Sequence, residues 1–292
     1  MTETRLVELV EYNTDGRKFF AKIEADNPTG SMKDRMVEYC IKKAEEGGEL
    51  KQGMTIIEAS SGNTGIALAK IGHERGYRVV ICVPQNISNI KKKMIEKNGG
   101  EYIEIDTGID NEADINTARR WGNGNQAYFF NQFENFYHVK AYYENLGEEV
   151  VKQLNKMDIT IDVLVAGVGT GGSLRGLGER LRNEHNPNLG IHAVIPKDNP
   201  TKIEGLHPGH IKGWFKIWED REKEFTNGPI FIDDGSAIKR AIEINKNPEL
   251  WVGVSSGAVL EAAIKEIGKK GNYLLLFGDS GNRYGELFTQ YL

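Results

Sequence analysis

Three short polar segments hold the residue types that could carry chemistry, and each lies where a strand would end or a helix would begin. The first runs from Gly167 to Ser173 and directly follows the apolar run Val163 to Ala166. Its glycines allow a tight turn whose N–H groups converge on an anion, and Thr170 and Ser173 add hydroxyl donors. The pattern predicts phosphate binding, with a plain structural turn as the alternative. It lacks the Gly-Lys-Ser/Thr ending of a nucleotide P-loop and the acidic residue that a dinucleotide site places about 20 positions later.

The second segment is Glu-Ala-Ser-Ser-Gly-Asn-Thr-Gly, from Glu58 to Gly65. The side chains of Ser60, Ser61, Asn63 and Thr64 would lie at a helix N-terminus, where hydroxyl and amide groups can bind a carboxylate. The alternative is an ordinary N-cap, because Ser and Asn cap helices routinely.

The third segment, Asn27 to Arg35, places Lys33 in the first turn of a predicted helix. A lysine is unfavourable at the positive end of a helix dipole, and this location favours the neutral amine that a nucleophile needs. A solvated surface lysine is the alternative.

Short β-branched runs alternate with longer amphipathic stretches, which is typical of an α/β protein with parallel sheets. The predicted strands are residues 55–58, 78–83, 102–105, 127–130, 163–166, 191–195 and 273–277. The predicted helices are residues 33–47, 63–75, 88–98, 112–121, 137–155, 172–184, 236–245 and 257–268.

Two further stretches depart from this alternation. Residues 5–12 and 17–24 flank Asn13-Thr14-Asp15-Gly16, and Asp-Gly between such runs predicts a β-hairpin, which we place at the edge of another lobe. Residues 197–234 form the least regular stretch, and a long irregular segment in a compact domain is more often functional than structural.

The composition is that of a globular protein, and it limits the partners. The 292 residues are 39% hydrophobic and 27% charged, with a net charge of −5 and no basic block, so we expect two lobes and no nucleic-acid partner. No apolar run is long enough for a membrane span, and the first residues lack the apolar stretch of a signal peptide. Cys40 and Cys82 share no short spacing, so we expect two buried thiols, no metal site and a cytoplasmic location.

Taken together, in this order and spacing, the three segments resemble the fold-type II pyridoxal-phosphate (PLP) enzymes, in particular the cysteine synthase (O-acetylserine sulfhydrylase) and cystathionine β-synthase family. The resemblance covers nearly the whole chain, from Thr4-Arg5-Leu6-Val7-Glu8-Leu9 to Asp279-Ser280-Gly281-Asn282-Arg283-Tyr284. It implies pyridoxal 5'-phosphate as cofactor and two open, twisted α/β domains with mainly parallel sheets and PLP in the cleft. The expected smaller domain is residues 32–137, and the larger combines residues 1–31 and 138–292.

The resemblance also implies roles for single residues. The family's Ser-x-Lys-x-Arg lysine corresponds to Lys33, which would carry PLP as a Schiff base and move the Cα proton. Gln132 would complete a substrate-carboxylate site formed by Ser60, Ser61, Asn63 and Thr64, in which Ser60 replaces a usual Thr and Asn63 also binds the phenolic oxygen of PLP.

The remaining cofactor contacts come from two later segments. Gly169, Thr170, Gly171, Gly172 and Ser173 correspond to the phosphate cup, with Ser173 for a usual Thr. Ser255, in Gly-Val-Ser-Ser-Gly-Ala, would hydrogen-bond the pyridine nitrogen. A hydroxyl there makes the ring a weaker electron sink than a carboxylate would, which suits β-elimination.

The segment 203–212 corresponds to the family's substrate loop, in which Gly205 would contact substrate. The sequence of this loop differs from the family's pattern. His207, His210 and Lys212 could attract an anionic substrate or could be exposed loop residues.

The function implied is β-replacement on an activated L-serine, O-acetylserine or O-phosphoserine, with sulfide to give L-cysteine, by a homodimer. The family's usual Gly-Asn-Thr-Pro is absent before Leu6, which leaves the dimer contacts open. Cystathionine β-synthase activity, with homocysteine as the thiol, is the alternative. Thr64 and Thr170 disfavour a serine or threonine dehydratase, and the presence of Lys33, Asn63 and Ser255 together disfavours a non-catalytic ligand-binding homologue.

Overall fold

The computed structural model describes residues 3–85, 87–106, 113–124, 127–207, 225–265 and 267–291. The chain forms two compact units. The smaller unit is Lys33–His138, and the larger unit combines Met1–Met32 with Val139–Leu292.

The smaller unit has a four-stranded sheet in the order β5-β4-β3-β6, and every neighbouring pair is parallel. Its strands are β3 Thr55–Ala59, β4 Arg78–Pro84, β5 Glu101–Ile105 and β6 Ala127–Phe129. Its helices are α1 Lys33–Glu46, α2 Asn63–Glu74, α3 Asn89–Lys97 and α4 Ala113–Gly124. Ile57, Ala59, Val80 and Cys82 form a buried cluster with Ala118 of α4, because alternate residues of a strand point to the same face.

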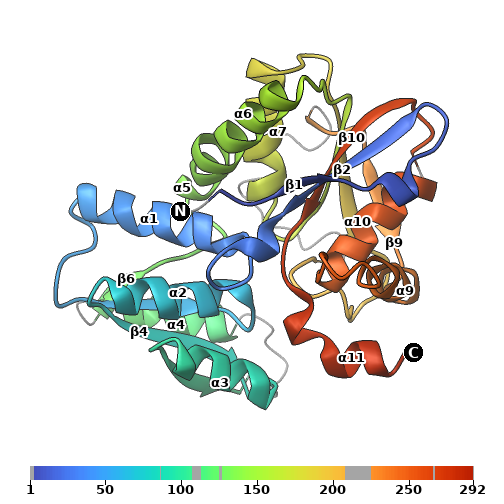
Figure 1. The fold of residues 1–292 in the computed structure, drawn as a ribbon. Helices are drawn as coiled ribbons and strands as arrows, with labels where there is room; N and C mark the ends of the chain where they lie inside the picture. Colours follow the sequence, from blue (N-terminus) through green and yellow to red (C-terminus); the bar gives the residue numbers. More distant parts are fainter. Residues whose placement is uncertain are drawn as a thin grey trace. The chain divides into compact units, whose positions relative to one another are not determined.

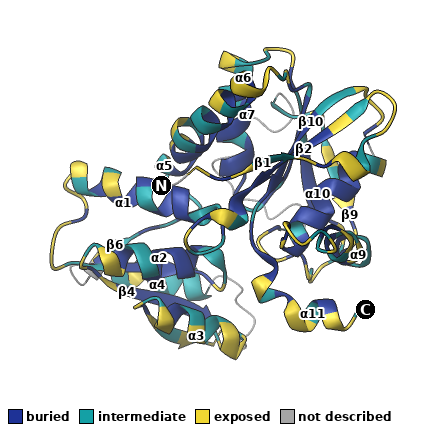
Figure 2. Cartoon of the chain, in the orientation of Figure 1, coloured by how far each residue is buried: buried dark blue, intermediate teal, exposed yellow. Residues whose placement is uncertain are grey.

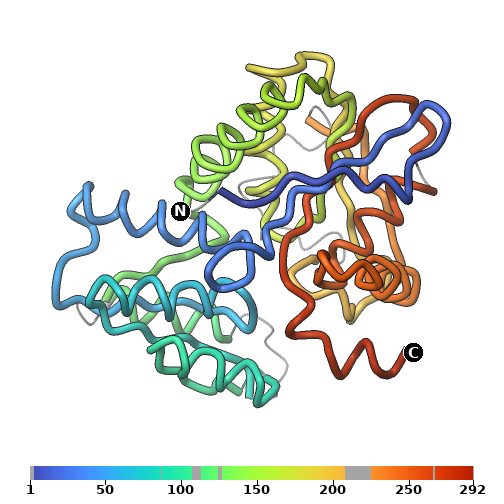
Figure 3. Tube along the Cα trace, viewed as in Figure 1, coloured from blue at the N-terminus to red at the C-terminus, as the bar shows by residue number. Residues whose placement is uncertain are grey.

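The larger unit has a six-stranded sheet in the order β1-β2-β10-β7-β8-β9. Its strands are β1 Leu6–Glu8, β2 Arg17–Ile23, β7 Val163–Gly167, β8 Gly190–Pro196, β9 Pro229–Ile232 and β10 Gly271–Phe277. Among the strands that the structure describes in this unit, only β1 and β2 pair antiparallel, with Leu6 opposite Lys22. Figure 3 shows β2, in blue, beside β10, in red, so segments from the two ends of the chain are neighbours in one sheet.

The helices of the larger unit are α6 Glu148–Met157, α7 Gly172–Glu184, α9 Asp234–Ile244, α10 Val254–Lys265 and α11 Gly285–Thr289 (Figure 1). Short 3-10 turns occur at Val10–Tyr12, Glu24–Asp26 and Gly281–Arg283. The chain enters the larger unit through α5 Tyr137–Ala141, which continues as a π-helix over Tyr142–Gly147. Helix α10 is apolar on most sides and almost wholly buried, as Figure 2 shows, and this makes it the central helix of the core.

The structure confirms the α/β class with mainly parallel sheets, each predicted strand and the N-terminal hairpin at a sheet edge. The single helix predicted over residues 137–155 is wrong in detail, because a π-helix interrupts it. A π turn adds one residue to a turn and leaves the apolar pattern nearly unchanged, so periodicity does not reveal it. The sequence prediction also missed β9, a short edge strand in the irregular stretch, and the five-residue α11.

Cys40 and Cys82 are buried free thiols, as expected, and burial raises the pKa of both. Among the residues described, no helix is long and apolar enough to cross a membrane.

Candidate active site

The predicted cofactor-binding segments of the larger unit lie at one edge of its sheet. Strands β2, β10, β7 and β8 are parallel neighbours, so their carboxyl ends lie along the same edge. The glycine-rich turn 167–173 follows β7, the segment 278–284 follows β10, and the chain that leaves β2 leads to Lys33. Open α/β sheets bind their ligands at this edge.

The glycine-rich turn has the backbone geometry of an anion site. Gly171 precedes α7 with a φ of 81°, a left-handed conformation that favours glycine. A Cβ added at Gly169 would lie 2.2 Å from the backbone oxygen of Gly205, so only glycine fits there. Thr170 and Ser173 are buried beside the N-terminus of α7, whose N–H groups carry partial positive charge. These residues fit the phosphate of PLP.

The first part of the predicted substrate loop packs against this turn. The backbone N–H of His207 donates to the carbonyl of Val168 at 3.1 Å. The side chain of Leu206 lies within 2.5 Å of a Cβ added at Gly167. Gly205 and His207 therefore lie beside the glycine-rich turn, whereas His210 and Lys212 lie outside the described residues.

Ser255 is the second residue of α10 and is half-buried. Its Oγ is 3.9 Å from a Cβ added at Gly278, and the sulfur of Met32 is 3.6 Å from the same position. The N–H of Met32 also donates to the carbonyl of Gly278 at 2.9 Å. Ser255 thus lies beside the segment that leads directly into Lys33.

Lys33 is the first residue of α1, at the helix start where the sequence predicted it, and its side chain is partly exposed. Met32, the residue before it, makes two hydrogen bonds within the larger unit. Its N–H donates to the carbonyl of Gly278, and its carbonyl accepts from the Tyr142 hydroxyl at 3.3 Å. Tyr142 begins the π-helix, and such helices are frequent at functional sites.

The predicted carboxylate-binding residues gather at the carboxyl edge of the smaller sheet. Thr64 and Gln132 come together, with Thr64 Oγ1 donating to Gln132 Oε1 at 2.7 Å. Ser60 Oγ accepts from the N–H groups of Gly65 at 3.1 Å and Gly62 at 3.3 Å, so this serine also stabilises the start of α2.

The two other members of the loop differ in exposure. Ser61 is exposed, and Asn63 is the half-buried first residue of α2. Asn63 Oδ1 is nevertheless buried and has no hydrogen-bond partner among the described residues, so it can accept a hydrogen bond from a ligand.

Two buried titratable residues contact Gln132, and the sequence reasoning assigned neither of them a role. Burial raises the pKa of Glu58 to about 8, although hydrogen bonds from the backbone N–H groups of Asn131 and Gln132 oppose the rise. Burial, followed by the positive charge of Lys33, lowers the pKa of His138 to about 3. One sequence signal existed for Glu58, a single acidic residue in an otherwise buried strand. No local pattern marks His138.

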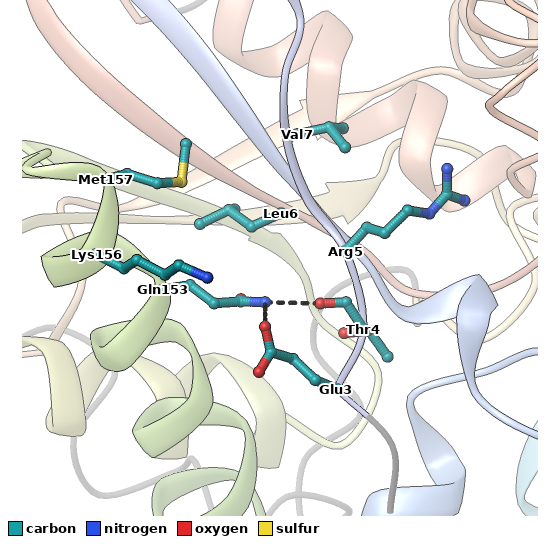
Figure 4. A pocket seen from close by; sticks show the side chains of 8 residues that line it. All are labelled: Glu3, Thr4, Arg5, Leu6, Val7, Gln153, Lys156 and Met157. Carbon is teal, nitrogen blue, oxygen red and sulfur yellow. Dashed lines mark hydrogen bonds between the residues drawn. The ribbon is translucent and has the colours of Figure 1, made fainter.

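A separate cavity of about 430 Å³ opens beside β1 in the larger unit and contains none of the predicted site residues. Figure 4 shows Gln153 of α6 reaching the first residues of the chain, where its Nε2 donates to Glu3 Oε1 at 2.9 Å and to the carbonyl of Thr4 at 2.8 Å. The cavity is lined by residues 3–7 of the N-terminal segment and by Gln153, Lys156 and Met157.

The family model of the pyridoxal-phosphate dependent enzymes matches residues 1–279. The chain belongs to this family. It is a PLP-dependent enzyme, and the glycine-rich turn described above is a suitable place for the cofactor's phosphate.

Curated relatives and a solved structure place the chain near the cysteine synthases. It is 32% identical over 277 residues to a cysteine synthase of Staphylococcus aureus, covering 91% of this chain and 86% of that protein. It is 31% identical over 299 residues to an O-acetylserine dependent cystathionine beta-synthase of Bacillus subtilis, covering 96% and 92%. A crystal structure of O-ureido-L-serine synthase superposes with a TM-score of 0.87 at 27% identity, covering 97% and 90%. The chain is therefore a cysteine synthase-like PLP enzyme.

Proposed function

We propose that this enzyme replaces the β-substituent of an activated L-serine, O-acetylserine or O-phosphoserine, by sulfide and so forms L-cysteine. The observation that carries the proposal is the pairing of Thr64 with Gln132 at the carboxyl edge of the smaller sheet, next to Ser61 and Asn63. These groups can bind the α-carboxylate of an amino acid. The similarity to a cysteine synthase supports sulfide as the nucleophile.

The residues that would hold PLP come from the segments already described. Gly169 to Ser173 would bind the phosphate, Ser255 the pyridine nitrogen, and Asn63 the phenolic oxygen, while Lys33 would bind the cofactor covalently. When bound, PLP supplies an electron sink for the negative charge that develops at the substrate's Cα.

The chain's own residues then perform the proton transfers. Once the substrate's amine has replaced it in the covalent bond, the freed Lys33 amine would take the proton from Cα of the substrate, and acetate or phosphate would leave from Cβ. Sulfide adds at Cβ, and Lys33 returns the proton to Cα. Ser61, Asn63 and Gln132 hold the carboxylate throughout, which keeps the Cα proton within reach of one amine.

A second candidate keeps the same amino-acid site and uses homocysteine instead of sulfide. The 31% identity to an O-acetylserine dependent cystathionine beta-synthase over nearly the whole of both chains favours it. The two activities differ only in the thiol that adds at Cβ, so the carboxylate site does not distinguish them.

The test is a matrix of substrates with the purified holoenzyme. O-acetylserine, O-phosphoserine and L-serine are each combined with sulfide and with homocysteine, and product formation is followed by chromatography. We expect the fastest turnover for an activated serine with sulfide. Faster turnover with homocysteine would establish the second candidate. No replacement product in any combination would refute the proposal.

We also propose a cytoplasmic homodimer, on the resemblance to the cysteine synthase family. Light scattering of the purified holoenzyme measures the mass directly, and a monomer would refute the assembly.

A further inference from the structure

Buried partners surround Gln132, which is itself 7% exposed. Its Oε1 accepts from Thr64, its Nε2 donates to the carbonyl of Ala59 at 3.3 Å, and its backbone oxygen lies 2.9 Å from Nδ1 of His138. A carbonyl oxygen can only accept a hydrogen bond, so Nδ1 of His138 must carry the proton in this contact.

Glu58 is a second buried group near Gln132. Its carboxyl group is 1% exposed, and interactions with the backbone N–H groups of Asn131 and Gln132 and with the Gln132 side chain act to lower its pKa against the larger effect of burial. Asn131 has a φ of 51°, and a left-handed residue lets two successive N–H groups converge on one acceptor. Among the described residues, Glu58 Oε2 has no hydrogen-bond partner. Burying a carboxyl group without a full set of hydrogen-bond partners costs folding free energy, so a buried Glu in a strand indicates a role beyond packing.

From these contacts we infer that His138 is a positioning residue for substrate binding. His138 donates to the backbone C=O of Gln132 and fixes that residue so that its side chain stays next to Thr64, where the substrate's α-carboxylate binds. The inference rests on the proposed function, because it assigns the carboxylate to Thr64 and Gln132, and it adds a group that does not touch the substrate.

The charge state of His138 agrees with this role. His138 is fully buried, and burial together with the charge of Lys33 keeps its ring neutral. A neutral imidazole has a single N–H, and the one on Nδ1 is committed to Gln132. The same ring therefore cannot donate a second hydrogen bond elsewhere in the site.

The experiment measures ligand binding to the holoenzyme by the change in cofactor absorbance. The ligands are L-serine and L-serinamide, which differ only in the α-carboxylate. His138→Leu removes the N–H donor, and His138→Asn retains a donor near the position of Nδ1. Val80→Ala is the matched control, because Val80 is a core residue of the same sheet without a hydrogen bond from its side chain.

We expect His138→Leu to weaken L-serine binding about tenfold, which corresponds to about 1.4 kcal/mol. The affinity for L-serinamide should stay within about twofold of the wild-type value. This ligand has no α-carboxylate, so a displaced Gln132 side chain costs it little. His138→Asn should recover L-serine affinity to within about threefold, and Val80→Ala should leave both affinities unchanged while lowering the unfolding midpoint.

Three results would overturn the inference. They are an unchanged L-serine affinity in His138→Leu, an equal loss for both ligands, and an equal loss in Val80→Ala. Should His138→Leu fail to fold, His138→Gln replaces it. Its longer side chain places the donor near Nε2, so it should lose affinity where His138→Asn does not, and equal behaviour of the two would refute the role. A wild-type holoenzyme that responds to neither L-serine nor O-acetylserine would instead refute the proposed function itself.

Discussion

At the scale of single residues, the proposed chemistry depends most on Lys33. It is the first residue of α1, directly after Met32, whose N–H and C=O are both hydrogen-bonded in the larger unit. These bonds fix the backbone at the point where the amine leaves the chain. The amine thus belongs to an ordered helix start rather than to a loose surface loop.

Lys33→Ala should abolish covalent attachment of PLP and turnover together, because the proposal gives both tasks to one amine. The fold should persist, since alanine is favourable in a helix. Borohydride reduction followed by peptide mass spectrometry locates the attached cofactor. Lys42→Ala, on the exposed face of the same helix, is the control and should behave as wild type. Attachment that survives in Lys33→Ala would mean that another lysine carries the cofactor.

At the scale of elements, the turn between β7 and α7 depends on how closely two backbone segments approach. The carbonyl of Gly205 occupies the place that a Cβ of residue 169 would need. The glycine-rich turn and residues 205–207 are therefore in direct contact, and a change in either displaces the other.

Gly169→Ala should weaken PLP binding at least tenfold, because the new methyl group would meet the Gly205 oxygen at 2.2 Å. Displacing that backbone should also destabilise the larger unit by about 1–3 kcal/mol. Cofactor retained after dialysis and the unfolding midpoint are the measurements. Gly285→Ala is the matched control, since a Cβ there meets no atom within 4 Å. Wild-type retention of PLP by Gly169→Ala would show that the turn can relax without cost to the phosphate site.

At the scale of the whole molecule, the buried groups around Gln132 make stability depend on pH in two opposite ways. Glu58 keeps its proton in the folded state up to about pH 8, whereas the unfolded chain releases it near 4.5. Stability therefore falls as pH rises between these values. His138 binds a proton near pH 6.5 when unfolded but only near 3 when folded, so stability falls as pH drops through that range. Where the two ranges overlap, the effects offset each other.

Glu58→Gln should remove the first of these effects. Between pH 6.5 and 8 the wild type should lose on the order of 2 kcal/mol of unfolding free energy that the variant keeps. Urea unfolding of both proteins at the two pH values measures the difference. Glu24→Gln, which alters a buried carboxylate of the larger unit, is the control. Parallel losses in wild type and Glu58→Gln would show that Glu58 is already ionised in the folded protein.

Most of the fold could be predicted from the sequence, because its signals are local. Each apolar run, such as Val163 to Ala166, forms a strand, and Lys33 and the glycine-rich turn lie at the helix starts where the sequence placed them. Backbone preferences and periodicity act within a few residues, so they can be read without knowing what lies nearby in space.

Only the tertiary structure decided which distant positions of the chain are in contact. Glu58 and His138 meet around Gln132 although they are 80 positions apart in the sequence, and the strand register that brings β3 beside β6 creates this meeting. The same holds for the carbonyl of Gly205 against Gly169, and for Tyr142 against Met32. Residue type and spacing could therefore indicate the reacting groups. Which residues position those groups depends on tertiary packing, because folding determines which distant side chains come into contact.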